Sequence, residues 1–226
     1  MFSLRIPKPG SISGFIFSLL LLCSSQLTGQ DTLRTYGPRI GIDIARFVFL
    51  LSDPAEIGAE ASLDLEVYKN IYPVFELGYN TVTLNQEEFN YSAGGIYGRF
   101  GMDYNLLPVK DRSVHHSIFA GGRYGISFFK QQAENIVAPN SYWGDFYLES
   151  YDNNLTGHWL ELVGGVRAEL ADNFFLGWTI RYKIMLSRGK DELMTPYLIP
   201  GFGKVSNNRS FGISYHVMYK IPLFKK

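Results

Sequence analysis

A chain of 226 residues is long enough for one ordinary domain or one all-β barrel, but not for a multidomain machine. The formal net charge is +0, which gives no electrostatic reason to expect a nucleic-acid partner, and one cysteine cannot form a disulfide scaffold. Aromatic residues make up 15% of the chain and glycines number 23, a combination that suits strands that bend and pack closely.

The first 30 residues have the three-part layout of a secretory signal peptide. Arg5 and Lys8 precede an apolar stretch over 12–22, and small residues follow it: Cys23, Ser24 and Ser25. The apolar stretch is shorter than the roughly 20 residues of a membrane-spanning helix. We therefore predict a signal peptide over residues 1–30, cleaved between 25 and 31. A retained anchor and lipid attachment at Cys23 are the alternatives. Cleavage removes two of the 21 basic residues, which leaves 19 against 21 acidic ones.

After a short segment over 31–37, alternation of apolar and polar residues predicts a barrel domain over 38–226. We predict eight strands, at residues 38–51, 58–69, 71–84, 92–107, 114–130, 155–171, 173–187 and 209–224. A tilted strand crosses a membrane with about 9 to 11 residues, and each of these is long enough.

The connections alternate between tight turns and longer loops. The turns YKNIYP, LPVKDRSV and LADNF are rich in Asn, Asp or Pro. The other set includes LNQEEFNY and two long loops, 131–154 and 188–208. Short turns at one end and long loops at the other are typical of an outer-membrane barrel, and an even strand count places both termini at the short-turn end.

Each predicted strand has one apolar and one polar row. In 173–187, Trp178 and Tyr182 share a row, while Arg181 and Lys183 lie on the other. So many rings would overfill the interior of an eight-stranded barrel, so we predict that the apolar rows face lipid. Enclosed charges persist when they are paired. We therefore predict a lumenal charge network made of Asp43, Glu60, Asp64, Glu66, Glu76, Arg99, Asp103, Arg123, Glu161, Arg167, Glu169, Arg181, Lys183 and Lys220.

Two other interpretations stay open. A soluble, lipocalin-like periplasmic barrel would turn the apolar rows inward around an apolar ligand. A lipid-modifying enzyme of the outer membrane would use His158 or His216, the latter beside Ser214 on one strand. The leading hypothesis includes no catalytic residue, no cofactor and no metal site, because no two histidines have H-x-x-x-H spacing.

The loop 131–154 contains aromatic residues among acidic ones. Exposed rings of this kind stack on sugars or anchor a partner protein. The candidates for binding an extracellular glycan or protein are Tyr142, Trp143, Phe146, Tyr147 and Tyr151. The alternative is that the two flanking strands extend as a hairpin packed on itself.

The segments GGRYGISFF, ELVGGVRAEL and SFGISYHVMYKIPLFKK complete this pattern. Over residues 38–224 the chain resembles small eight-stranded outer-membrane barrels of the OmpA and OmpX kind, and more narrowly a Bacteroidota outer-membrane barrel family of unassigned function. The resemblance implies an all-β, antiparallel, up-and-down transmembrane barrel and transfers no catalytic residue. One departure is Phe224, which follows Pro222 and lies off the apolar row. We expect a monomeric, non-enzymatic barrel in contact with outer-membrane lipid, with a structural or surface-interaction role through the two long loops.

Overall fold

The computed structural model describes residues 35–46, 55–85, 90–107, 116–138, 146–189, 191 and 194–225. The strands are β1 (Thr35–Tyr36), β2 (Arg39–Asp43), β3 (Glu56–Asp64), β4 (Ile71–Asn85), β5 (Asn90–Asn105), β6 (Ser117–Ala138), β7 (Phe146–Ala171), β8 (Phe174–Ser187), β9 (Leu198–Ile199), β10 (Gly203–Lys204), β11 (Arg209–Lys220) and β12 (Phe224–Lys225). The predicted signal peptide lies outside the described residues. Within them, no helix has the length and apolarity needed to cross a membrane.

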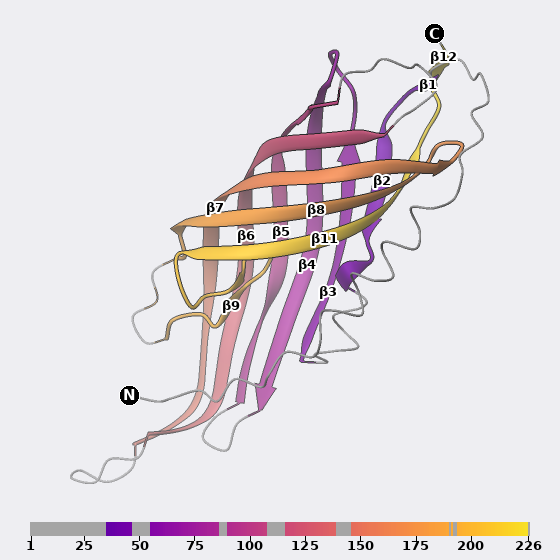
Figure 1. Cartoon of the computed structure of the whole chain (residues 1–226). Helices are drawn as coiled ribbons and strands as arrows, with labels where there is room; N and C mark the ends of the chain where they lie inside the picture. The colour runs from indigo at the N-terminus through magenta and orange to yellow at the C-terminus, as the bar shows by residue number, and fades with distance from the viewer. Residues whose placement is uncertain are drawn as a thin grey trace, which may run out of the picture. The chain divides into compact units, whose positions relative to one another are not determined.

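Eight strands close into an antiparallel barrel in the order β11-β2-β3-β4-β5-β6-β7-β8, as Figure 1 shows. Strand β11 pairs with β8 on one side and with β2 on the other, so the last barrel strand meets the first. Within the barrel, closure pairs each of the eight strands on both sides. The all-β, eight-stranded antiparallel barrel predicted from alternation is confirmed. Beyond the barrel, Phe224 pairs with Tyr36 in the short β1–β12 ladder.

One end of the barrel, here called the short-turn end, carries the connections 65–70 and 172–173 and the end of β5 with the start of β6. Asn70 and Asn173 adopt positive φ angles of 67° and 66° in two of these turns. Asparagine tolerates this left-handed conformation better than most residues with a Cβ. The predicted strand 58–69 ends earlier, at Asp64; beyond it only single backbone hydrogen bonds, from Leu65 to Pro73 and from Val67 to Ile71, and an isolated bridge between Tyr68 and Ile71 continue towards the turn.

At the opposite, long-loop end, β6 and β7 form a hairpin that continues past β8 and β11 (Figure 1). Their pairing reaches Ala138 and Phe146, so the prediction of a loop over 131–154 is wrong for most of that segment. The hairpin alternative describes it correctly. The residues of this segment are polar and typical of loops, but they form a β-ladder. Its inward positions Gln131 and Ala133 are fully buried. The predicted strand 38–51 is shorter in the structure, where β2 ends at Asp43.

The two faces of the wall differ sharply. On β4, Phe75 and Leu77 point outward and are 50% and 54% exposed, whereas Glu76 between them points inward and is 3% exposed. Tyr72, also on β4, points inward and is buried, and the Arg39 guanidinium lies 4.7 Å from its ring centroid. The interior has charged layers towards the short-turn end and apolar clusters towards the long-loop end.

Candidate functional site

The central charged layer is organised by Arg99 of β5. Its guanidinium forms ion pairs with three carboxylates from three other strands: Glu60, Glu76 at 3.0 Å and Glu161 at 3.4 Å. Glu60 also accepts a 2.5 Å hydrogen bond from the Tyr97 hydroxyl. Because these carboxylates come from β3, β4 and β7, the guanidinium ties distant parts of the wall together across the interior.

Arg181 of β8 is the second cation of this layer. Its two terminal nitrogens donate to both oxygens of Glu76 at 2.9 and 3.0 Å, a bidentate geometry, and one of them also reaches Glu161 at 3.1 Å. Its Nε donates to Ser214 Oγ at 3.1 Å. Ser214 therefore accepts a hydrogen bond from a lumenal arginine, and no described hydrogen bond joins Ser214 to His216.

A second charged layer lies nearer the short-turn end. Arg123 contacts Asp103 at 2.7 Å, and Arg167 forms an ion pair with the other oxygen of the same carboxylate. Arg39 contacts Asp64 at 2.6 Å. Arg123 also lies 3.7 Å from Glu76, so the two layers form one connected network.

The remaining network candidates lie at its margins. Asp43 accepts hydrogen bonds from the backbone N–H groups of Ala45 and Tyr215, at 2.9 and 3.0 Å. Lys220 lies 3.9 Å from the half-buried Glu169 near the short-turn end. Glu66 is half-buried in the 65–70 turn and is not on a strand.

Lys183 is buried and donates from Nζ to the carbonyl oxygens of Gly201 and Phe202, at 2.7 and 3.1 Å. It therefore holds the 188–208 segment against the interior of the barrel. This contact joins the charged layer to a feature that the sequence analysis did not predict.

That feature is an apolar plug formed by the 188–208 segment. Ile199 and Phe202 are fully buried among inward-facing side chains, and the Phe202 ring packs edge-on against Trp159 at 6.1 Å between centroids. Gly125 makes room for this layer, since a Cβ there would lie 2.1 Å from the Trp159 ring. The sequence signal was the apolar stretch YLIPGF inside a polar loop.

Asp191 anchors the same segment to the β6–β7 hairpin. It accepts hydrogen bonds from Tyr151 at 2.6 Å, Asn153 at 3.2 Å and Gln131. The bond to Asp191 raises the pKa of the Tyr151 phenol. Of the other loop candidates, Tyr142 and Trp143 lie outside the described residues. Phe146 and Tyr147 belong to β7 and pair with Ala138 and Val137.

Cavities of different size lie beside the network. One of about 10 Å³, room for roughly one water molecule, lies among Asp64, Glu76 and His216. Another, of about 710 Å³, lies beside the 201–214 segment, and its lining includes Asp43 and Lys183.

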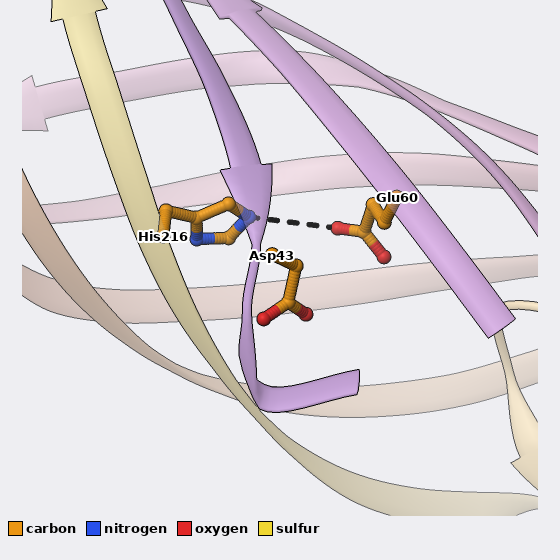
Figure 2. Close-up of side chains that lie close together, drawn as sticks. All are labelled: Asp43, Glu60 and His216. Carbon is orange, nitrogen blue, oxygen red and sulfur yellow. Dashed lines mark ion pairs between the residues drawn. The ribbon is translucent and has the colours of Figure 1, made fainter. Parts of the chain in front are cut away.

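Figure 2 shows three inward side chains from neighbouring strands: Asp43 of β2, Glu60 of β3 and His216 of β11. His216 Nε2 lies 3.6 Å from Glu60 Oε1. The nearest ligand atoms of all three residues lie within 4.8 Å of one another, a spacing suited to a metal ion. Sequence reasoning missed this group because its members are separated by up to 173 positions.

Two other histidines lie apart from this group. His158 is outside the lumenal row, on the outward parity of β7, where its Nδ1 lies 2.7 Å from the Tyr124 hydroxyl. His116 Nδ1 accepts a hydrogen bond from the backbone N–H of Glu169 at 3.3 Å. His115 lies outside the described residues.

A family model described as "Domain of unknown function (DUF6048)" matches residues 11–226. Among solved structures, the chain is similar to the crystal structure of Acinetobacter baumannii CarO2, at 9% identity and a TM-score of 0.39, over 84% of this chain and 100% of that chain. No curated protein sequence matches the chain.

Proposed function

The chain belongs to the DUF6048 family, and we propose that it is a non-enzymatic outer-membrane barrel with a closed lumen. Its proposed role is structural or surface-interacting, at the long-loop end. The observation that carries the proposal is the inverted distribution of apolar and charged side chains across the barrel wall.

This inversion is clear on β5. Ile96, Phe100 and Met102 point outward and are 55%, 55% and 61% exposed, whereas Arg99 and Asp103 point inward and are each 1% exposed. Water-soluble proteins rarely leave large contiguous apolar surfaces uncovered. Outward rows on the other barrel strands repeat the pattern, so the apolar surface encircles the barrel. Lipid is the solvent that such a belt matches, and an outward apolar band is the mark of a membrane barrel.

The soluble-carrier alternative requires an apolar cavity for its ligand. The apolar part of the interior is instead filled by the protein itself, through Ile199 and Phe202. The same filling supports a closed lumen, because a conducting pore needs a continuous aqueous path. A cavity of about 710 Å³ lies beside the plug, but within the charged layers the cavity among Asp64, Glu76 and His216 holds roughly one water molecule.

The enzymatic alternative rests on Ser214 with His216, or on His158. Ser214 Oγ accepts from the Arg181 guanidinium, whose cation withdraws electron density from the hydroxyl and does not act as a base for it. This contact favours a structural role for Ser214 as a partner of Arg181.

The first test is fractionation followed by gel electrophoresis in detergent, with and without boiling. We expect the protein in the outer-membrane fraction, with a band that shifts on boiling as the closed barrel unfolds. A protein that stays soluble without detergent would contradict the membrane assignment. A planar-bilayer recording should give no stable open channels, and steady conductance would contradict the closed lumen.

The surface role is proposed because Asp191 fixes the 188–208 segment to the β6–β7 hairpin, which gives the long-loop end a defined shape. The folded chain should bind a glycan on a glycan array or a partner protein in a pull-down. An Asp191→Ala variant should lose this binding. A Lys130→Met variant, on the outer part of β6, is the matched control. The role would be wrong if neither assay gave binding or if both variants bound equally.

A further inference from the structure

We propose that Asp43, Glu60 and His216 bind a divalent transition-metal ion such as Zn²⁺, which joins β11, β2 and β3 where the barrel closes. This inference goes beyond the proposed function and does not depend on it, because it concerns side chains inside the barrel. The site combines one imidazole with two carboxylates, a donor set that zinc and its neighbours accept.

The sheet register places the three side chains in one row. His216 is directly opposite Asp43 across the β11–β2 ladder. Ile42 is opposite Ala61 in the β2–β3 ladder, so the next antiparallel step brings Asp43 beside Glu60. Cβ atoms directly opposite each other on neighbouring strands lie about 4.5 to 5.5 Å apart. The backbone therefore presents three ligands side by side on the inward face.

Two of the ligand atoms are buried without a hydrogen-bond partner. These atoms are Glu60 Oε1 and His216 Nε2, and the two residues are 5% exposed each. They face each other at 3.6 Å. Two ligands of a tetrahedral zinc ion are separated by about 3.4 Å, given metal–ligand distances near 2.1 Å. An ion between them would give each atom the bond that it lacks, since Arg181 at 3.7 Å from Glu60 Oε1 is too far for a hydrogen bond.

The surrounding contacts orient the two carboxylates. Both backbone bonds to Asp43 go to its Oδ1. Glu60 Oε2 is held by Tyr97 and Arg99, so Oε1 points towards His216. Such outer contacts fix the orientation of metal ligands. The widest spacing of 4.8 Å must shorten by about 1.4 Å for a common ion at 2.1 Å from each ligand, a movement that side-chain rotation supplies.

Three arginines also face Glu60, and their positive charge opposes a metal ion. Arg46 and Arg181 lie 3.6 and 3.7 Å from its oxygens, and Arg99 forms an ion pair with it. Arg99 and Arg181 both contact Glu76 and Glu161 as well, and these two carboxylates offset their charge. Arg123 also shares Glu76, so the negative charges of Glu60 and Asp43 face the proposed ion together with the partly buried Arg46 and part of the charge of Arg99 and Arg181.

The position also suggests what the ion would do. Within the described residues, β2 pairs with β11 over five residues and with β3 over four, whereas β4 and β5 pair over fifteen. A metal ion bonded to all three strands would reinforce these short ladders. The cavity of about 710 Å³ that Asp43 lines gives an entry path from the long-loop end.

The experiment uses the full folded chain in detergent, stripped with a chelator and titrated with Zn²⁺ alone by calorimetry. We expect one zinc ion per chain. His216→Gln and Asp43→Asn should each weaken binding at least about 100-fold, beyond the usual effect of changing an outer contact. His158→Gln, which alters an outward histidine, is the matched control and should bind as the unaltered chain does. Replacement of zinc by Co²⁺ should give the visible absorption of a four-coordinate nitrogen and oxygen site.

A second readout keeps the test valid if a variant folds poorly. Zn²⁺ should raise the temperature at which the compact gel band disappears in the unaltered chain and in His158→Gln, but not in His216→Gln. The metal site would be overturned if zinc did not change the stability of the compact band in the unaltered chain and calorimetry detected no binding. The barrel proposal would stay intact. Equal binding by His216→Gln and the unaltered chain would overturn the metal site as well.

Discussion

Replacement of Arg181 by methionine should destabilise the barrel strongly. Arg181 is 1% exposed, and its guanidinium makes two bonds to Glu76 and one to Glu161, at 2.9 to 3.1 Å. Removal of one partner of a buried ion pair costs about 3 to 5 kcal/mol, because the remaining charges stay buried. Arg99 still contacts both carboxylates, so we expect the lower end, about 3 kcal/mol.

The measurement is urea-induced unfolding of the refolded protein in detergent, followed by tryptophan fluorescence and by the boiling-sensitive gel band. Lys130→Met is the matched control, since it breaks a 3.1 Å pair with Asp152 in which the side chains are 44% and 58% exposed. Exposed pairs of this kind contribute about 0 to 1 kcal/mol. The double variant Arg181→Met with Glu76→Gln should lose less than the sum of the two single variants, because the two side chains contact each other directly. Equal losses in Arg181→Met and Lys130→Met would refute the argument that the buried network stabilises the barrel.

Three further changes test other parts of the structure. Gly125→Ala should cost about 1 to 3 kcal/mol in the same unfolding assay, because its Cβ would lie 2.1 Å from an indole carbon. Gly98→Ala, with its nearest atom at 3.9 Å, should cost little, and equal effects would contradict the packing argument. Leu162 points outward and is 63% exposed. Leu162→Arg should lower the free energy of unfolding in lipid vesicles by about 2 to 4 kcal/mol for a position near the bilayer midplane. An unchanged free energy of unfolding would favour a surface in water. Phe202→Ala removes the ring that seats the plug, so trypsin should cleave after the exposed Lys204 faster than in the unaltered chain. Unchanged cleavage would mean that other contacts hold the segment.

Much of the wall could be predicted from local sequence. Alternation identified eight strands, because successive side chains of a strand point to opposite faces, and it separated Arg181 from Trp178 correctly. Asparagine identified the turns at Asn70 and Asn173, since this residue tolerates positive φ. The strand ends were less accurate. The β6–β7 hairpin continues through residues whose composition is typical of loops, because a neighbouring ladder satisfies their backbone groups.

The sequence by itself determined that this chain forms strands with an apolar and a charged face, since side-chain alternation depends on adjacent residues only. The tertiary structure decided what the charged face contacts. Closure of the barrel joins residues that are far apart in the chain. It determines which carboxylates Arg99 contacts, where Phe202 packs, and that Asp43 lies opposite His216. Periodicity contains no information about such distant neighbours, because the order of residues along one strand does not bring them together. Strand register and sheet curvature do.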